Sequence, residues 1–373
     1  MNIGILLPGF SSDENDWAIP VQLNLVREMA RHDDVRVLAL RYPHRQDCYP
    51  IYGATVYSLG MGQVRGVRRL ALWWDALRTL RRLHQEVPFD VLHAMWADET
   101  GLIAAWAGRR LNIPVVISIA GGELVGFDDI CYGLQRGAFS RWIVRQALTG
   151  ADRIVVACDY MRRLVNIPQA KISKIVLGVD TQVFSLDGTV RAPDRLVHVA
   201  SLVGVKDQAT LLRAMARLQG VHLDIVGTGS EQARLTALAA QLGVTDRVHF
   251  LGAVHHLDLP TYLRRATLNM LSSRHEGLGM VTLEAAACGT PTVSTAVGLL
   301  PDCPEMGVVV PVGDDAALAD AIQLLLNNPE QREQLARTAR EAVCARFTIQ
   351  HTAKLFRALY QELSDEKRSV KKK

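Results

Sequence analysis

A glycine-rich turn at residues 275–279 carries the clearest chemical signal in the sequence. It lies between an apolar run at 268–271, which predicts a buried strand, and residues 280–288, which predict a helix ended by glycine and proline. Such a turn presents unpaired backbone N–H groups and the positive end of the helix dipole, and both favour a bound diphosphate. Glu276 stands at the mouth of the turn. Glu284 lies inside the helix, where a carboxylate can accept two hydrogen bonds from a ribose diol.

Three residues near the ends of other predicted strands are further candidates. Lys206 follows the strand at 195–200 and can reach a phosphate as a point charge, although a loop lysine is also commonly a solvated side chain. Gly227 opens a tight turn after the strand at 222–226, where glycine is common for backbone reasons alone. His93 lies near the end of the strand at 91–94, and a lone histidine is more often structural than ligand-binding.

Short apolar runs alternate with helical patterns along the whole chain. Continuous apolar runs are typical of parallel strands buried on both faces, and their alternation with helices predicts doubly wound α/β sheets. Glycine, aspartate and proline at 177–195 predict a linker between two Rossmann-like domains that face each other across a cleft, with ligands at the carboxyl ends of the strands. The predicted strands are 3–7, 35–40, 91–94, 115–119, 153–157, 195–200, 222–226, 247–250, 268–271, 292–295 and 308–310, and the predicted helices include 19–31, 208–218 and 231–242.

The stretch 272–293 resembles the E-x7-E segment of the retaining glycosyltransferases of family 4, in the order strand, S-x-x-E-G-x-G, helix with E-A-x-A, then G-x-P. The resemblance covers most of the chain and is closest from 197 to 312. It implies the GT-B fold, in which residues 1–185 bind the acceptor and residues 190–346 bind a nucleoside-diphosphate sugar. A C-terminal helix at 347–365 would pack back on the first domain. The resemblance also implies that the sugar is transferred with retention of configuration.

The resemblance assigns roles to individual residues. Glu276 would contact the donor sugar, Glu284 the ribose and Lys206 the diphosphate. The segment 248–252 would border the nucleobase. The remaining donor contacts would come from the backbone at Gly277, Gly279, Met280, Val281, Gly227 and Phe250.

Three positions depart from the family pattern. Ser201 stands where the family has an arginine on the diphosphate, so a bidentate clamp is missing and Lys206 must carry a larger share. Ala120 replaces a histidine that contacts the donor sugar. Glu123, after a Gly-Gly turn, is a candidate for that task, and the alternative is an acid at a helix N-terminus. In the family, the loop after the first strand is glycine-rich and approaches the donor. In this chain, Gly9 is the one glycine of that loop. The acids of this loop, which would then face the acceptor, are Asp13, Glu14 and Asp16.

Composition excludes several other classes of protein. A net charge of +4 over 373 residues does not indicate nucleic-acid binding. The six cysteines contain no C-x-x-C pair, so we expect free, buried thiols rather than zinc ligands or disulfides. No D-x-D segment is present, and we expect neither a metal nor a cofactor, because positive protein groups would stabilise the leaving diphosphate. No apolar run approaches the ~20 residues of a membrane span or forms a signal peptide, so we expect a cytoplasmic protein.

A basic amphipathic helix is predicted at residues 64–84. Basic helices with interfacial tryptophan can lie on the anionic inner face of a membrane, and an ordinary helix packed on the core has the same pattern. A basic tail at 366–373 is predicted to be disordered and would add attraction to such a surface. The apolar residues of the helix are Val67, Leu70, Trp74, Leu77 and Leu80, and its basic residues are Arg65, Arg68, Arg69, Arg78, Arg81 and Arg82.

The sequence therefore predicts a glycosyltransferase that acts on a lipid-linked, saccharide or small-molecule acceptor. The alternative is a non-catalytic GT-B protein that binds nucleotide sugars as a partner or regulator, and the departures at Ala120 and Ser201 would favour it. A dehydrogenase is disfavoured because no G-x-G-x-x-G follows the first strand. A sugar-nucleotide epimerase shares the architecture, but the E-x7-E segment indicates transfer.

Overall fold

The computed structural model describes residues 1–64 and 66–370 and divides the chain into two compact units. The first unit consists of Met1–Val176 with Ile349–Lys373, and the second of Leu177–Thr348. Arg65, predicted in the basic helix, and residues 371–373, predicted in the tail, lie outside the described residues.

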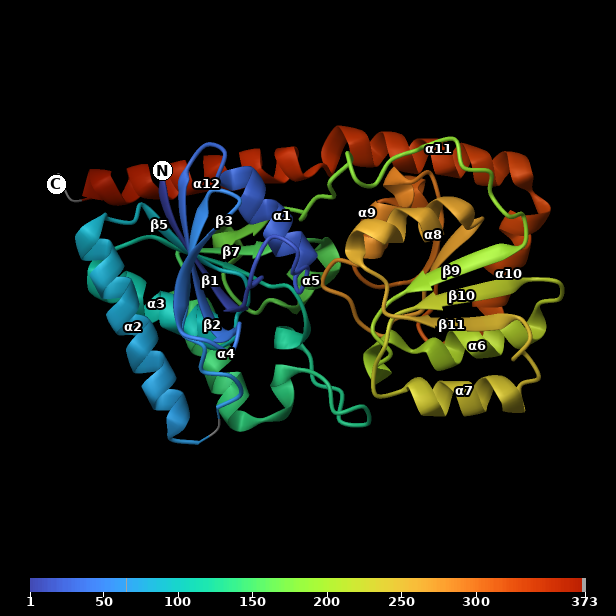
Figure 1. The fold of residues 1–373 in the computed structure, drawn as a ribbon, viewed down its shortest axis with the longest axis horizontal. Helices are drawn as coiled ribbons and strands as arrows, with labels where there is room; N and C mark the ends of the chain where they lie inside the picture. Colours follow the sequence, from blue (N-terminus) through green and yellow to red (C-terminus); the bar gives the residue numbers. More distant parts are fainter. Residues whose placement is uncertain (65, 371–373) are drawn as a thin grey trace. The chain divides into compact units, whose positions relative to one another are not determined.

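The first unit contains a twisted sheet with helices packed against it (Figure 1). Its strands are β1 (Asn2–Gly9), β2 (Asp34–Tyr42), β3 (Asp47–Ile51), β4 (Ala54–Ser58), β5 (Val91–Ala94), β6 (Val115–Ser118), β7 (Arg153–Val156) and β8 (Ile172–Lys174). They follow the order β3-β4-β2-β1-β5-β6-β7-β8 and run parallel, except for the antiparallel pair β3–β4. The main helices are α1 (Pro20–Met29), α2 (Arg68–Glu86), α3 (Glu99–Leu111), α4 (Ala138–Gly150), α5 (Asp159–Leu164) and α12 (Ile349–Val370).

The second unit contains a sheet whose strands all run parallel within the described residues. The strands are β9 (Arg195–Val199), β10 (His222–Val226), β11 (Val248–Gly252), β12 (Leu268–Leu271), β13 (Thr292–Thr295) and β14 (Gly307–Val310), in the order β11-β10-β9-β12-β13-β14. The main helices are α6 (Gln208–Arg217), α7 (Gln232–Gln241), α8 (Leu259–Arg265), α9 (Met280–Ala287), α10 (Asp315–Asn327) and α11 (Pro329–Arg346). This order places the carboxyl ends of β10, β9 and β12 side by side.

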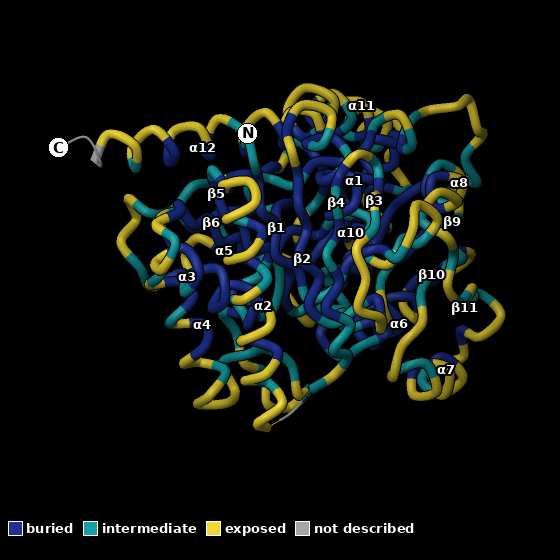
Figure 2. The backbone as a smooth tube through the Cα atoms, turned by 60° about the vertical axis from the view of Figure 1, so that its left-hand side comes forward, coloured by how far each residue is buried: buried dark blue, intermediate teal, exposed yellow. Residues whose placement is uncertain are grey.

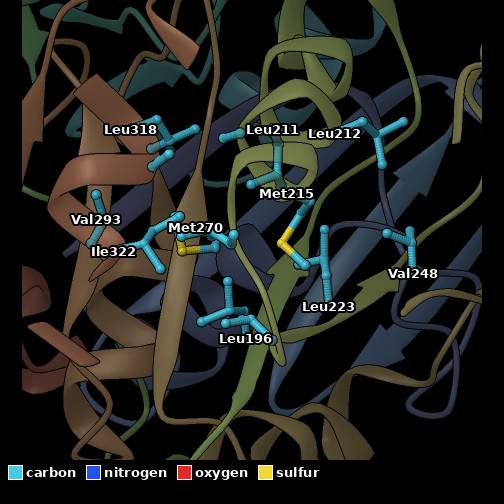
Figure 3. Packing of buried hydrophobic residues seen from close by; sticks show 14 of the residues in the cluster. Leu196, Leu211, Leu212, Met215, Leu223, Val248, Met270, Val293, Leu318 and Ile322 are labelled. Atoms are coloured by element: carbon cyan, nitrogen blue, oxygen red, sulfur yellow. The ribbon is translucent and has the colours of Figure 1, made fainter. Parts of the chain in front are cut away.

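The hydrophobic core of the second unit explains why its strands are continuous apolar runs. Leu196, Leu223 and Met270 point from adjacent strands toward helices α6 and α10 (Figure 3). Leu212 and Ile322 approach them from those two helices, and all five side chains are fully buried. Because a parallel strand in such a layer has a helix over each face, successive residues are both apolar rather than alternating.

The structure confirms the predicted fold class of two doubly wound α/β sheets. Strands β5, β10, β12 and β13 have the predicted bounds. Strands β3, β4 and β8 were not predicted. They lie toward the edges of the first sheet, are short and are only partly buried, so they lack the continuous apolar signal of the central strands.

The chain that follows Val176 packs on the second unit from its start. Val179 donates its backbone N–H to Phe347 O at 2.9 Å, so the two segments that join the units lie beside each other. Gly178 allows this approach, because a Cβ there would stand 2.3 Å from Thr348 O. Phe184 is buried against His256 at 5.1 Å between ring centroids. Residues 177–185, assigned to the first domain from sequence, therefore group with the second unit.

Helix α12 continues further than predicted and includes residues 366–370, which were expected to be disordered. Lys367 donates to Ile113 O at 3.0 Å, and Arg368 pairs with Asp90 at 2.8 Å. These contacts give the last turn partners on the first unit, so the prediction of a disordered tail was wrong for these residues.

All six cysteines are free, but they are not all buried. Cys158, Cys288 and Cys303 lie in the interior as predicted, whereas three others are exposed on loops, strand edges and helix surfaces. A cysteine without a paired partner gives no sequence signal that distinguishes these two environments. The exposed ones are Cys48, Cys131 and Cys344.

A buried polar contact fastens α12 to the sheet of the first unit. His93, in β5, is fully buried, with Nδ1 2.5 Å from the Tyr360 hydroxyl and Nε2 2.8 Å from the Ser118 hydroxyl. Burial lowers the pKa of His93 to about 3, so the imidazole is neutral. Tyr360 and Phe356 pack their rings against it. The interaction joins residues from the two ends of the chain into one core.

We expect Tyr360→Phe to destabilise the first unit by about 1–3 kcal/mol, because the change leaves a buried histidine nitrogen without its hydrogen bond. Urea unfolding followed by circular dichroism measures the loss. Tyr57→Phe is the matched control, since the Tyr57 hydroxyl makes no hydrogen bond to any residue that the structure describes. Equal stability of the two variants would contradict the anchoring role of Tyr360.

Candidate functional site

The turn between β12 and α9 is built to expose backbone N–H groups. Gly279 caps the helix with φ +80°, a conformation that glycine adopts without steric cost. Met280 and Val281 are the first two helical residues, and the geometry of an α-helix leaves their N–H groups without intrahelical acceptors. Gly277 lies in the same turn and is buried. The turn therefore offers the positive end of α9 to an anionic ligand, as predicted from its glycine pattern.

Glu276 and Lys206 form an ion pair at this turn. Lys206 Nζ lies 2.6 Å from Glu276 Oε1, and Ser273 Oγ donates to the same oxygen at 2.6 Å. Both charged side chains are largely buried. Backbone contacts fix the two loops, since Arg274 N–H donates to Val205 O at 2.8 Å. A carboxylate, an ammonium group and a helix N-terminus thus lie together at the carboxyl edge of the sheet.

Glu284 is a buried carboxyl group with no partner among the residues that the structure describes. Its side chain lies in α9, is only 6% exposed and makes no hydrogen bond or ion pair with residues 1–64 or 66–370. Burial raises the pKa of Glu284 from 4.5 to about 7. A buried carboxyl group normally finds donors within the protein, so Glu284 is a candidate to accept hydrogen bonds from a ligand.

A neutral histidine supports the loop that carries Lys206. His198, in β9, donates from Nδ1 to Met270 O at 2.9 Å, and its Nε2 accepts from the Gln208 amide at 3.2 Å. Gln208 also donates to Ser201 O at 3.0 Å. Burial lowers the pKa of His198 to about 4, which keeps it in this neutral form. Sequence reasoning missed His198 and Ser273, although a histidine inside an otherwise apolar strand was a visible signal.

Ser201, Gly227 and Phe250 lie at or near the same edge. Ser201 is exposed just after β9. Gly227 has φ +136°, and a Cβ there would lie 2.0 Å from Ala200 O, so no other residue fits without a backbone shift. Gly227 N–H donates to Gly252 O at 2.8 Å, which joins this turn to the end of β11, where Phe250 is half-buried. The strand order brings these residues to the edge that carries Lys206 and Glu276.

His93 does not belong to an accessible site. Its full burial and its two hydrogen-bonded nitrogens leave no atom for a substrate, so its prediction as a binding residue was wrong. Proximity to a strand end suggested binding, but the side chain of a β5 residue can also point into the layer beneath α12.

Glu123 is committed to the turn that it follows. Its carboxylate is buried and accepts from Ala120 N–H at 3.1 Å and Gly121 N–H at 2.7 Å. Burial raises its pKa, with the backbone donors acting in the opposite direction. Glu123 lies in a 3-10 helix, Gly122–Leu124, so the structure corresponds to the helix-terminal alternative rather than to a catalytic group. The glutamate orders the backbone at the position where Ala120 replaces the family histidine.

The loop after β1 is also held by its own acids. Asp16 accepts from the Tyr42 hydroxyl at 2.7 Å and from Ser12 N–H at 2.8 Å. Burial acts to raise its pKa, but these hydrogen bonds outweigh it and the pKa is lowered. Asp13 and Glu14 are both exposed, and each accepts a backbone hydrogen bond, from Asn15 N–H and Tyr52 N–H respectively. Gly9 begins the loop, and a Cβ there would lie 2.9 Å from Tyr42 Cβ, so its small size serves packing with β2.

No group of three or more histidine, cysteine, aspartate or glutamate side chains in the described residues is arranged to hold a metal ion. None of the helices in the described part of the chain is long and apolar enough to cross a bilayer.

Each of the two units matches a known protein family. Residues 189–342 match the model of glycosyl transferases group 1, and residues 19–175 match a glycosyl transferase 4-like domain. Alpha-D-kanosaminyltransferase of Streptomyces kanamyceticus is 26% identical over 79% of this chain and 82% of its own length. D-inositol 3-phosphate glycosyltransferase of Mycobacterium avium is 33% identical over 61% of this chain and 59% of its own.

Solved structures share the fold at low sequence identity. Sucrose-phosphate synthase from Thermosynechococcus elongatus has a TM-score of 0.80 at 21% identity and covers 97% of this chain and 99% of its own. Anabaena HepE in complex with UDP has a TM-score of 0.73 at 16% identity, covering 97% of this chain and 100% of its own. At these low identities, the similarity establishes that the chain shares the fold of these proteins.

We expect the stability of Glu284→Gln relative to the native protein to increase as the pH rises from about 4.5 to about 7, because the native protein loses stability in this range. Below this window Glu284 is protonated in both states. Within it the unfolded chain ionises while the buried carboxyl stays neutral, so the free energy of unfolding falls, by about 3 kcal/mol in total. Glutamine is neutral throughout and escapes this loss.

Thermal unfolding midpoints measured across this pH range give the difference between the two proteins. Glu341→Gln, on the exposed face of α11, controls for the loss of one carboxylate. A difference between Glu284→Gln and the native protein that does not change with pH would show that Glu284 does not titrate as assigned.

Proposed function

We propose, from the premise that this chain belongs to the glycosyltransferases of the GT-B fold, that it transfers a hexosyl group from a nucleoside-diphosphate sugar to an acceptor with retention of configuration. The observation that carries the proposal is the grouping of Glu276, Lys206 and the N-terminus of α9 at one edge of the second sheet, with Glu284 buried further along the same helix. These groups are complementary to a sugar, a diphosphate and a ribose in succession.

The donor would be held by the second unit. Glu284 would accept the ribose hydroxyls, which would supply the donors that the described residues do not provide to this buried carboxyl group. The N–H groups of Met280 and Val281 would donate to the phosphate and sugar. Phe250 and its neighbours would border the nucleobase. HepE, whose structures are described in complex with UDP, with UDP and glucose and with UDP-glucose, supports a donor of this class.

The reaction would break the bond between the anomeric carbon and the diphosphate and form the bond to the acceptor oxygen on the same face of the sugar. The acceptor proton would leave with the diphosphate. Lys206 and the α9 N-terminus would stabilise the negative charge that develops on the leaving group, without a bound metal or cofactor. Ser201 supplies no positive charge, so Lys206 carries a larger share of this task.

The acceptor would be bound by the first unit, in a protein on the cytoplasmic side of the membrane. Its class stays open among lipid-linked, saccharide and small-molecule acceptors. The second candidate function is a non-catalytic nucleotide-sugar sensor, which the absent arginine at Ser201 and histidine at Ala120 favour. Both functions require donor binding, and only the first requires turnover.

Incubation with radiolabelled nucleotide sugars separates these functions. Donors that raise the thermal midpoint by mass action are selected first, and release of nucleoside diphosphate is then measured with and without candidate acceptors. Transfer or slow hydrolysis supports the enzyme. Donor binding without either supports the sensor, and no stabilisation by any nucleotide sugar contradicts both.

We expect Glu284→Ala to weaken the binding of both the donor and the free nucleoside diphosphate, because both contain the ribose. Lost hydrogen bonds to a charged group are worth ~1.5–3 kcal/mol, or roughly a tenfold to hundredfold loss of affinity. Isothermal titration calorimetry with the diphosphate measures this directly. Glu341→Ala is the control on an exposed surface. If Glu284→Ala binds the nucleoside diphosphate with unchanged affinity, Glu284 is not the residue that contacts the ribose.

We expect Lys206→Ala to reduce turnover far more than stability, because Lys206 is the cation that faces the leaving group. The Lys206 side chain is 25% exposed, and Ser273 Oγ still donates to Glu276 when the lysine is removed, so the cost to the fold is smaller than the cost to turnover. Initial rates and thermal midpoints are compared with those of Lys354→Ala, which removes an exposed lysine from α12. Near-normal turnover in Lys206→Ala would mean that another cation stabilises the diphosphate.

A further inference from the structure

Helix α2 has two apolar sides, of which only one packs on the protein. The inner side buries Leu72, Trp73, Leu80 and Leu83. It is held by a polar contact, in which the Trp73 indole donates to Glu99 Oε1 at 3.0 Å. This inner side gives α2 the core-facing apolar stripe that an ordinary surface helix has.

The outer side exposes large apolar residues to solvent. Val67, Leu70 and Trp74 are 82%, 58% and 65% exposed, which is far more than a folded core residue shows. The spacing in the sequence places these residues and Leu80 on one apolar stripe of the helix. The structure separates them, because only Leu80 of that stripe is buried. The predicted stripe therefore does not face the core as a whole, and other apolar residues of the helix, such as Leu72 and Leu83, pack there.

A groove between α2 and α3 adjoins this outer side. It has a volume of about 710 Å³ and is lined by Trp74, Leu77 and Leu111 together with three arginines from the two helices. The three are Arg78, Arg81 and Arg110. No carboxylate is among the lining residues, so the groove combines apolar walls with positive charge.

The three groove arginines have no ion-pair partner within the described ranges 1–64 and 66–370. Other arginines of the helix do, since Arg69 pairs with Glu99 and Arg82 with Glu86. The two acids of α2, Asp75 and Glu86, are exposed and lie outside the groove lining. The positive charge of the groove is thus not neutralised by the protein itself.

Aromatic residues at the start of α4 extend the exposed surface. Phe139 and Trp142 are both about half exposed and stack at 5.9 Å between ring centroids. Phe139 also stacks on Trp73 of α2 at 6.3 Å, and the Arg69 guanidinium lies 5.0 Å from its ring centre. Figure 2 shows the exposed stretches of α2 and α4 within the first unit.

We propose that the outer side of α2, its groove with α3 and the start of α4 form a docking surface for a bilayer that contains anionic phospholipid. Arg78, Arg81 and Arg110 bind lipid phosphates, and Trp74 enters the interfacial region with Leu77 beside it. Exposed tryptophan next to unpaired arginines matches a lipid surface, which offers apolar and anionic groups at the same depth. Docking at this surface would bring the proposed enzyme to a lipid-linked acceptor. Only this biological use rests on the proposed function.

Flotation of the full chain with vesicles tests this surface without donor or acceptor. We expect the protein to float with phosphatidylcholine vesicles that contain phosphatidylglycerol at low salt, and to be released as salt rises. Arg78→Gln with Arg81→Gln and Arg110→Gln removes three charges near the surface and should reduce vesicle affinity roughly a hundredfold, at about fivefold per charge. Trp74→Ser should reduce it by a smaller factor.

The matched control replaces Arg31, Arg163 and Arg337 with glutamine, which removes the same charge from exposed positions elsewhere. Circular dichroism establishes that each variant is folded. No flotation of the native protein, equal flotation with phosphatidylcholine alone, or equal losses in the test and control variants would each overturn the proposal. Because nucleotide-sugar turnover is not measured in this experiment, its failure is distinct from failure of the proposed function.

Discussion

Lys206 and Glu276 leave two neighbouring strands of the second sheet, and their side chains meet at 2.6 Å. This contact depends on β9 lying beside β12, which the parallel order of the sheet imposes. Within the protein the pair neutralises two largely buried charges. A diphosphate would attract Lys206 and repel Glu276, whereas sugar hydroxyls would donate to Glu276. A sugar diphosphate can therefore satisfy both members of the pair, and neither a sugar nor a phosphate alone can do so.

Buried polar groups in this protein fall into two kinds. His93 and Glu123 are deeply buried, but each has its hydrogen bonds completed by the protein, and each holds a structural element in place. Glu284 is also buried, but no residue in the described part of the chain completes its hydrogen bonds. Burial alone therefore does not identify a functional residue here. A buried carboxyl group without a donor in the described residues is the better candidate, because its hydrogen bonds can come from a ligand.

The sequence predicted the central strands and the turn before α9 well, because both follow from local physics. Continuous apolar runs mark strands covered on both faces, and Gly279 marks a left-handed residue at a helix start. Edge strands such as β3 were missed, because partial burial leaves an irregular pattern. The direction of the His93 side chain could not be predicted, because its partner Tyr360 lies 267 positions away in the chain. For α2, helical spacing gave the apolar residues but not which of them face solvent.

Helix α12 belongs to the first unit, although the whole second unit separates it from the rest of that unit in the chain. During synthesis the ribosome therefore completes the second unit before the residues that cover β5 have been made. Until then His93 and the apolar surface that Phe356 covers remain open to water. The second unit is continuous in sequence and has no such delay. The part of the protein that is made first is consequently the part that finishes folding last, and its incomplete core is what a chaperone would encounter on the nascent chain.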